Sequence, residues 1–243
     1  MIIKNEYGYV DFMDEYPQLI QRRNIGINLS AGTDSAFLMY STLKKIQQDN
    51  LDSAVIPITG VDIRRPTNEW HAREIVLYFK EQFPDVKILQ HQFHYYDKEH
   101  EKDKPNKHKE HEKKLFSEKT IDVLFHGVTA NPDKQSMIDM GFYENRETKR
   151  DSKNSKFVSH ANQSHTGDLY RDNFMWYAPF AFLNKKFIAE EYRKNGLMEE
   201  LFPMTASCIG YAKHTNFWSE PCKECWWCKE KKWAFGMYDG GVQ

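Results

Sequence analysis

The sequence predicts an α/β protein with a parallel, twisted sheet and helices on both faces. Short apolar segments, such as residues 25–29 and 53–60, alternate with longer segments of helical periodicity, such as residues 36–47. Alternation of this kind is typical of βαβ units, whose strands pair in parallel. The chain has 243 residues, of which 40% are hydrophobic, so it can bury a core of the size that this class needs.

The first strand and the first helix have the clearest patterns. Residues 25–29 form an apolar run of strand length, and residues 36–47 follow the helical period. The helix is expected to bury one face made of Phe37, Tyr40, Leu43 and Ile46. Small or acidic residues fill the turn between these two elements, at positions 30–35.

The second strand and the second helix follow at residues 53–60 and 64–83. The strand ends at Gly60, and Pro66 and Thr67 provide the start signal of the helix. The apolar side of this helix is expected to consist of Trp70, Ile75, Leu77 and Phe79.

Two further strands are predicted at residues 86–96 and 121–132. The second of these ends at Asn131 and Pro132, a dipeptide that is typical of turns. Ligands of such sheets bind beyond the carboxyl ends of the strands, and the 30–35 turn lies at one of these ends.

Two polar segments interrupt the alternation of strands and helices. Residues 97–114 contain no hydrophobic residue and mix both signs of charge, which is typical of a solvated loop or an exposed helix end. The alternative is a lid over the site, or a weak metal-binding tract that uses His100, His108 and His111. Residues 133–172 are polar and irregular, and we expect a long active-site loop there, because loops of this length are usually functional or disordered.

Overall charge gives no support to a general affinity for nucleic acid. The 34 basic and 35 acidic residues nearly cancel, so contact with a polyanion would have to be local; such contact is not excluded. The sequence has no run of 18 apolar residues, so we expect no membrane span. The first residues include acidic side chains where a signal peptide would be basic and then apolar, and a cytoplasmic location is expected.

The 30–35 turn, with the sequence SAGTDS, is suited to binding an anion. The N-terminus of a helix has unpaired backbone N–H groups and a partial positive charge. Gly32 permits close backbone approach, and Asp34 would either cap the helix or hold Mg²⁺. Additional hydroxyl donors come from Ser30, Thr33 and Ser35. The turn lacks the lysine of a Walker loop, which excludes the ordinary P-loop.

All four cysteines belong to one predicted metal site. Cys222, Cys225 and Cys228 are spaced C-x2-C-x2-C, and Cys208 lies 14 positions upstream. Clustering of this kind in a chain without a secretion signal favours a metal over disulfides. Four thiolates suit a structural, tetrahedral Zn²⁺, while an iron–sulfur cluster and free or disulfide-bonded cysteines remain alternatives.

The SAGTDS turn resembles the SGGxDS signature of the PP-loop ATP pyrophosphatases, whose fold is that of the adenine nucleotide α-hydrolases. In that superfamily the loop holds the pyrophosphate end of ATP while an oxygen atom of the acceptor attacks the α-phosphate. The resemblance implies ATP and Mg²⁺ as cofactors. Ala31 stands where the family has its first glycine, and the methyl group is tolerable if φ stays negative there.

The carboxyl-terminal half is similar to the 7-cyano-7-deazaguanine synthase family. The similarity lies in MTASC, in PCKECWWCKEKKWAF and in a helix that begins near LNKKFI. Asn184 is placed as the N-cap of that helix, Lys185 occupies the lysine position of the family, and Ile188 faces the core. The resemblance implies an AMP-forming ligase of the queuosine or deazapurine pathway, which adenylates a small-molecule carboxylate and transfers ammonia to it.

These resemblances assign the site residues by role. The catalytic residues would be Asp34, Ser35 and Lys185. The nucleotide would be bound by Ser30, Ala31, Gly32, Thr33, Asp34 and Ser35, with Asp62 on the ribose and Arg65 on a phosphate, although these last two could form a surface ion pair. The metal ligands would be Cys208, Cys222, Cys225 and Cys228.

The substrate-reading segment of that family is absent, so the acceptor is open. His126, Thr129, Asn131 and Asp133 stand in its place, and Thr129 and Asn131 are our candidates for contact with the substrate. His91 and His94 are candidates for a general base, although neither has a visible partner.

The predicted organisation has two parts, an ATP-binding domain at residues 1–200 and a zinc-binding segment at residues 201–243. Two alternatives to the synthase-like activity remain open. One is a PP-loop enzyme that adenylates another carboxylate or a nucleobase carbonyl of tRNA or DNA. The other is a degenerate nucleotide-binding protein without turnover, for which Ala31 is the main indication. A homodimer is compatible with all three.

Overall fold

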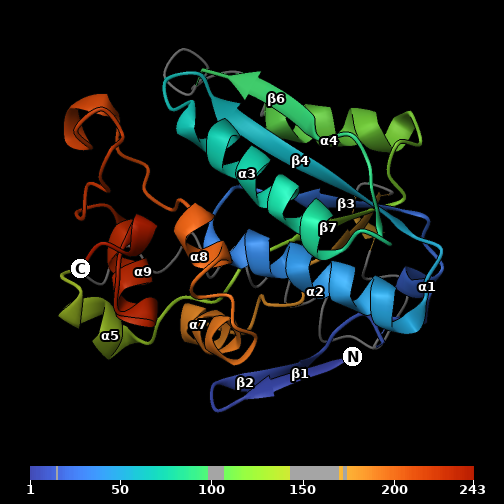
Figure 1. Ribbon diagram of the computed structural model, residues 1–243, viewed down its shortest axis with the longest axis horizontal. Coiled ribbons are helices and arrows are strands. Elements are labelled where there is room, and N and C mark those ends of the chain that lie inside the picture. The colour runs from blue at the N-terminus through green and yellow to red at the C-terminus, as the bar shows by residue number, and fades with distance from the viewer. Residues whose placement is uncertain (15, 98–106, 143–169, 172–173) are drawn as a thin grey trace.

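A largely parallel sheet forms the centre of the protein (Figure 1). The computed structural model describes residues 1–14, 16–97, 107–142, 170–171 and 174–243. Within them the strands of this sheet lie in the order β5-β4-β3-β7-β9-β8, and β6 also pairs with β4. The strands are β3 (Asn24–Asn28), β4 (Ala54–Asp62), β5 (Lys87–Ile88), β6 (Gln92–Tyr96), β7 (Val123–His126), β8 (Tyr170–Arg171) and β9 (Phe174–Tyr177).

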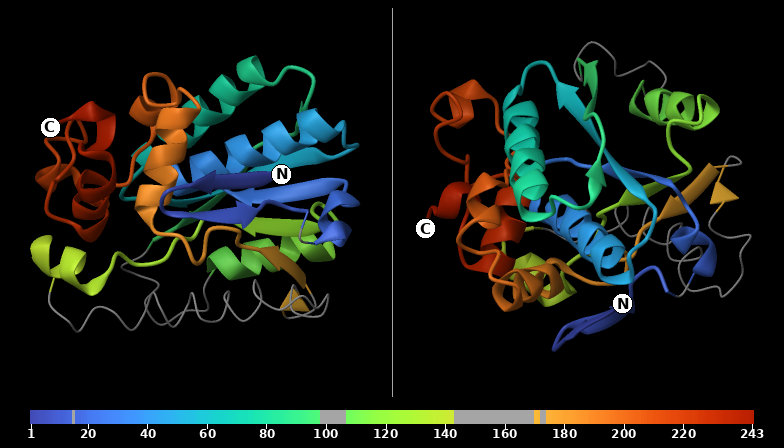
Figure 2. Two further views of the ribbon diagram at one scale, coloured as in Figure 1. Left: turned by 90° about the horizontal axis from the view of Figure 1, so that it is seen from below. Right: turned by 45° about the vertical axis from the view of Figure 1, so that its right-hand side comes forward.

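Helices cover both faces of this sheet, which confirms the predicted fold class. The helices α2 (Thr33–Asp49) and α3 (Thr67–Gln82) lie on one face, and α4 (Lys107–Ser117) lies on the other (Figure 2). Among the described strands of this sheet, all pairings of β3 are parallel, and only β8 runs antiparallel to its partner. The sequence predicted β3 and α2 within a few residues of their observed bounds. Three of the four residues expected on the buried face of α2, Phe37, Leu43 and Ile46, are buried, and Tyr40 is half-buried.

The predicted third strand is two strands, and a proline explains the break. β5 pairs with Ala54 and Val55 of β4, whereas β6 pairs with residues from Ile58 onward. Residues two apart in a strand face the same neighbour, so Pro57 faces the same edge as Val55, whose carbonyl accepts a hydrogen bond from Leu89. Pro57 has no N–H to donate there, and the ladder is interrupted.

The predicted apolar side of α3 is wrong in two of its four residues. Trp70 and Leu77 are 56% and 55% exposed. The buried stripe consists of Ala72, Ile75, Val76 and Phe79. These positions follow the i, i+3, i+4, i+7 spacing of one helical face, and Trp70 and Leu77 lie outside it.

Several short elements of the structure have no clear pattern in the sequence and were not predicted. They are a hairpin of β1 (Ile2–Asn5) and β2 (Gly8–Asp11), the short helix α1 (Pro17–Ile20), and the strands β8 and β9. β9 is nevertheless part of the sheet, because Leu124 and Phe125 of β7 pair with it in parallel.

Both polar segments contain helices in their described parts. Residues 107–114 belong to α4, and the segment 133–172 begins with α5 (Lys134–Asp139), which Asp133 caps through the N–H of Ser136. His100 and most of the predicted active-site loop lie outside the described residues.

The carboxyl-terminal segment packs against the sheet domain through its helices. It consists of α8 (Leu201–Met204), η2 (Ala212–His214), α9 (Trp226–Phe235) and η3 (Asp239–Gly241). α9 packs on α7 (Lys185–Lys194), and α8 packs on α3 (Figure 1). Among the described residues, no helix combines the length and the apolar character of a transmembrane segment.

Candidate nucleotide site and cysteine cluster

The 30–35 loop holds a fixed shape through its own hydrogen bonds. The Ser35 hydroxyl accepts from the backbone N–H of Ser30 at 3.1 Å and donates to the carbonyl of Gly32 at 3.0 Å. Because this hydroxyl is already bonded within the loop, Ser35 stabilises the turn between β3 and α2. Ser30 is the exposed hydroxyl of the loop, whereas Thr33 is fully buried.

The N-terminus of α2 has no side-chain cap. Gly32 is the N-cap residue, and it makes no side-chain cap hydrogen bond. Asp34 therefore does not cap the helix, although the sequence offered that as one of its two roles. The uncapped N–H groups and the helix dipole form a site that fits the oxygens of a phosphate.

Asp34 is instead bound to a buried lysine. Lys185 Nζ lies 2.8 Å from Asp34 Oδ2 and 3.4 Å from Glu230 Oε2, and the Lys185 side chain is 6% exposed. Thr129 donates its hydroxyl to Asp34 Oδ2 at 3.4 Å. Gly127 permits this approach, since a Cβ there would lie 2.8 Å from the backbone of Asp34. The structure thus brings three of the sequence-predicted site residues, Asp34, Thr129 and Lys185, into one cluster at the loop.

The position of Lys185 follows from the start of α7. Asn184 is the N-cap, as predicted, and its side chain accepts from the N–H of Lys186 at 3.0 Å. Ile188 is fully buried, also as predicted. A lysine in the first turn opposes the helix dipole, and here the carboxylates of Asp34 and Glu230 offset that cost. Glu230, on α9, looked like an ordinary charged residue in the sequence; its burial shows only in the fold.

Ala31 has a positive φ, whereas its methyl group was expected to be tolerated only if φ stayed negative. Its φ is +65°, in the left-handed region, and the residue is fully buried. Its carbonyl accepts a hydrogen bond from the N–H of Ala206 at 2.9 Å. The methyl group therefore lies inside the protein and does not project into the loop opening, but the backbone carries the strain of a non-glycine residue in this region.

Asp62 and Arg65 lie at and just beyond the carboxyl end of β4. Asp62 is buried and accepts from the N–H of Arg64 at 3.1 Å, and Arg64 also pairs with Asp97. Arg65 donates to the side chain of Asn68 at 2.8 Å.

Asn131 directly follows the bridge between Ala130 and Asn184, close to the start of α7. Nucleotide roles for Asp62 and Arg65, and substrate roles for Thr129 and Asn131, stay predictions.

His91 has a partner in the structure, the hydroxyl of Thr59. His91 Nε2 lies 2.8 Å from Thr59 Oγ1, which donates to the carbonyl of Leu29 at 2.6 Å. Burial lowers the pKa of His91 to about 4, so the ring is neutral near pH 7. Such a ring is a structural hydrogen-bond partner in this site.

The His91 ring gives a prediction for the pH dependence of stability. Its pKa is about 4 in the fold, below its ordinary value of 6.5, so the unfolded chain takes up the proton first as the pH falls. The contribution of the neutral His91 ring to the free energy of unfolding is complete above pH 6.5 and is lost as the pH falls from 6.5 to 4. One pKa unit corresponds to about 1.4 kcal/mol, so the loss amounts to about 3 kcal/mol. In urea unfolding, the free energy of unfolding of H91Q should fall less than that of the wild type as the pH is lowered from 6.5 to 4. Parallel curves for the two proteins would contradict the prediction. His214→Gln, which replaces an exposed histidine, is the control and should behave like the wild type.

The four cysteine sulfurs converge on one point. All four Sγ atoms lie within 4.8 Å of one another, and those of Cys222 and Cys228 are 3.9 Å apart. Four thiolates around one ion at about 2.3 Å would be about 3.8 Å apart. Hydrogen bonds from Cys208 and Cys228 lower the pKa of the Cys225 thiol, and Cys225 is also the N-cap of α9. The donor set therefore fits a single tetrahedral metal ion.

The cysteine cluster is joined to the 30–35 loop by a short stretch of chain. The Ala206 N–H bonds to Ala31, and two residues later Cys208 donates its N–H to Asp239 Oδ2 at 2.7 Å. Lys231, which is fully buried, bonds to Asp239 at 2.6 Å and to the carbonyl of Thr205 at 3.1 Å. Sequence reasoning missed Lys231 and Asp239, because a charged helix end and a Gly-rich turn carry no sign of burial.

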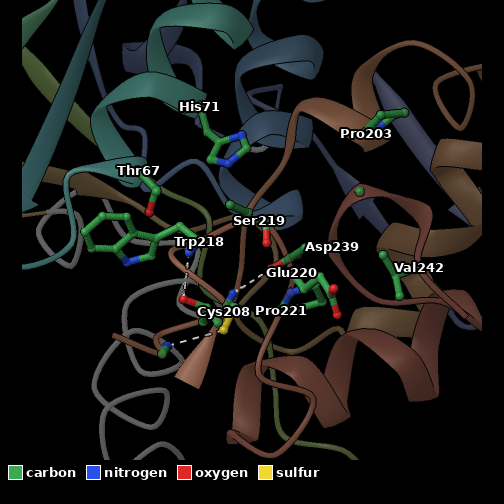
Figure 3. Close-up of a pocket in the computed structure, with 14 residues that line it drawn as sticks. Thr67, His71, Pro203, Cys208, Trp218, Ser219, Glu220, Pro221, Asp239 and Val242 are labelled. Carbon is green, nitrogen blue, oxygen red and sulfur yellow. Dashed lines mark hydrogen bonds between the residues drawn. The ribbon is translucent and has the colours of Figure 1, made fainter. Parts of the chain in front are cut away.

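A pocket of about 200 Å³ lies beside this stretch (Figure 3). Thr67 and His71 of α3 form one side, and Trp218 and Asp239 face them from the carboxyl-terminal segment. Cys208 and Ala206 also line it, so the pocket borders both the cysteine cluster and the segment that contacts the loop. The His71 ring bonds to the carbonyl of Met204 at 2.9 Å, and burial lowers its pKa.

Fold and site together define a Rossmann-like α/β protein with a four-cysteine centre. No family model matches the chain, and no curated protein matches it. Among solved structures it is similar to a U34-tRNA thiolase, NcsA from Methanococcus maripaludis, described with its [4Fe-4S] cluster. That match has 11% identity and a TM-score of 0.43, and covers 87% of this chain and 64% of the other. The chain thus spans less than two thirds of that structure's length, and its function has to be inferred from its own residues.

Proposed function

We propose that the protein is an AMP-forming, ATP-dependent ligase of the PP-loop type, which adenylates a carboxylate. One observation carries the proposal: an internally braced loop presents the uncapped N-terminus of α2 next to the buried Lys185. The triphosphate of ATP is an anion of the kind that this arrangement binds. The SAGTDS sequence of the loop and its resemblance to the PP-loop signature support the same assignment.

The residues of the site support this chemistry by positioning and charge. A carboxylate oxygen attacks the α-phosphorus of ATP, the bond to the β-phosphate oxygen breaks, and pyrophosphate leaves. The α2 N–H groups and Lys185 would hold the departing pyrophosphate and stabilise the charge that develops on it. Mg²⁺ would screen the phosphates, with Asp34 as the nearby carboxylate. Ammonia then attacks the acyl-adenylate, and an amide and AMP result; a second ATP-driven dehydration would give a nitrile, as in 7-cyano-7-deazaguanine synthases.

Zinc is our proposal for the cysteine cluster. The sulfur separations suit four ligands of one ion, whereas in a four-iron cluster each thiolate binds a different iron atom and the sulfurs lie farther apart. Metal analysis of the purified protein should return about one zinc per chain bound by the cysteines, and this is the equivalent that Cys208→Ser should lose. Iron with visible absorbance would overturn the assignment.

A second candidate function keeps the adenylation and changes the acceptor. The pocket beside Ala206 and Cys208 supports it, because a planar ring such as a nucleobase could enter next to Trp218. A nucleobase carbonyl of tRNA or DNA would then be adenylated. The net charge of −1 gives no support to general binding of a polynucleotide.

One experiment separates these candidates. The protein is incubated with ATP, Mg²⁺, ammonia and 7-carboxy-7-deazaguanine, and the products are identified by mass analysis. A new amide or nitrile together with AMP supports the synthase-like activity. AMP formation only with another carboxylate or with tRNA supports a different acceptor, and ATP binding without any AMP supports a protein that has lost turnover.

The variant Ala31→Gly tests the last of these outcomes. Relief of the left-handed strain is worth about 1–2 kcal/mol. The added freedom of glycine costs about 0.5–1 kcal/mol, and the lost buried methyl about 0.8 kcal/mol. Since these terms nearly cancel, we expect the free energy of unfolding to change by less than about 1 kcal/mol and AMP formation to stay close to the wild-type rate. If only the variant forms AMP, Ala31 is a disabling substitution.

A further inference from the structure

A second group of metal-ligating side chains lies at the carboxyl ends of the strands, on the face that α4 covers. His108 and Glu112 are one helical turn apart on α4, and Asn28 and His126 end the strands β3 and β7. Asn28 Nδ2 lies 2.9 Å from His108 Nε2, 3.2 Å from Glu112 Oε1 and 3.4 Å from His126 Nδ1. Three side chains from two elements therefore converge on one atom.

No placement of hydrogens satisfies all of these contacts. The amide has two hydrogens for three acceptors, and His108 Nε2 also lies 3.0 Å from Glu112 Oε1. If the His108 ring donates to Glu112, its hydrogen meets the amide hydrogens of Asn28. If the ring accepts from Asn28, its lone pair faces the carboxylate. Exchanging the oxygen and nitrogen of the amide sets the Asn28 oxygen against Glu112 instead.

The burial of the Glu112 carboxylate requires a positive charge at the same point. Glu112 is 2% exposed, and a buried carboxylate is costly unless a cation balances it. The His108 ring could supply this charge only as a double donor, and then the contact with Asn28 would be repulsive. A cation at the point of convergence would instead be approached by lone pairs from all three acceptors.

We infer that His108, Glu112 and His126 bind a divalent first-row transition-metal ion at the position of the Asn28 amide. Two imidazoles and one carboxylate are a usual donor set for Zn²⁺, Fe²⁺ or Ni²⁺. Among the described residues, only the four cysteines have donor atoms already within 4.8 Å of one another. The new site would therefore close on binding, as the His126 ring moves toward the ion and the Asn28 amide turns aside or offers its oxygen.

The surroundings of this site are also rich in imidazole. The His94 ring of β6 stacks on His111 at 5.3 Å and lies 6.0 Å from His108. Asn28 is two residues before Ser30, so the ion would lie at the sheet edge where ligands of such folds bind. This site is separate from the cysteine cluster and from the Mg²⁺ that accompanies ATP, so its existence does not depend on the proposed function.

Cobalt is the probe for the test. Full-length protein with zinc at the cysteines is titrated with Co²⁺, followed by absorbance and by metal analysis after dialysis. We expect a second metal equivalent with weak d–d bands and no thiolate charge-transfer band. E112Q and H108A should each weaken this equivalent at least tenfold, and Asn28→Asp should tighten it by adding a carboxylate. The exposed His214→Ala is the matched control.

Two results would overturn the inference. One is a single metal equivalent that shows only thiolate charge transfer; the other is a second equivalent that E112Q and H108A leave unchanged. If H108A fails to fold, thermal unfolding of E112Q still tests the site, because glutamine keeps the shape of the glutamate side chain. In the wild type, Co²⁺ should raise the Tm, since an ion that binds only the folded state stabilises it. The same rise in E112Q would count against the site.

Discussion

Lys185→Met is expected to lower the rate of AMP formation by at least about a hundredfold, the usual effect of removing one group that stabilises transition-state charge. The lysine lies 2.8 Å from Asp34 and 3.4 Å from Glu230, next to the loop that would hold the pyrophosphate. Its removal leaves two carboxylates without their cation where the proposed pyrophosphate would bind. The measurement is AMP release by the purified variant with the best acceptor found for the wild type.

Loss of fold is the alternative explanation that this experiment must exclude. Breaking a buried ion pair costs about 3–5 kcal/mol, so circular dichroism and the Tm are recorded for each variant. Lys186→Met is the matched control: it removes the adjacent lysine, which lies over the Trp233 ring, and should leave the rate unchanged. Asp34→Asn keeps the shape of the side chain and should also abolish AMP formation. Folded Lys185→Met protein with the wild-type rate would remove this lysine from the mechanism.

Cys208→Ser should release the metal and weaken ATP binding at the same time. Cys208 would supply one of four ligands, and Ala206, two residues before it, holds the carbonyl of Ala31. A structural zinc site contributes about 10–16 kcal/mol to the folded state of small zinc domains, so its loss should disorder the segment that braces the loop. Metal content, Tm and the affinity for a non-hydrolysable ATP analogue are measured together.

Ser207→Ala is the control in the same stretch of chain. It keeps the cysteine and the backbone N–H that bonds to Asp239, so the metal and the ATP affinity should both persist. If Cys208→Ser loses its metal but binds the analogue as tightly as the wild type, the cluster and the loop are independent.

Local sequence patterns predicted those elements whose residues are determined by strand or helix periodicity or by helix capping. The strand before the 30–35 loop and most of the buried face of α2 follow from periodicity, and Asn184 as the cap of α7 was placed with the family resemblance; the structure has all three. The convergence of the cysteines was also visible in their spacing. Whether Asp62, Arg65 and the loop residues bind ATP stays a prediction.

Features that depend on contacts between distant parts of the chain could not be predicted from the sequence. Glu230 and Lys231 have the pattern of a solvated helix, and they are buried only because α9 packs against α7 and Asp239 folds back onto them. The break between β5 and β6 depends on a proline in the neighbouring strand. Ala31, whose φ is positive, bonds to Ala206, which lies 175 positions later in the chain.

That bond between Ala31 and Ala206, together with the contacts of Lys231 and Asp239, sets the order in which the protein can mature. The 30–35 loop is translated well before the residues that brace it, which lie beyond position 200. A nascent chain can therefore form its central strands while the proposed nucleotide site is still incomplete. We expect competence for ATP to arise only after translation passes Asp239 and the cysteines take up their metal, so that metal supply during synthesis governs the yield of active protein.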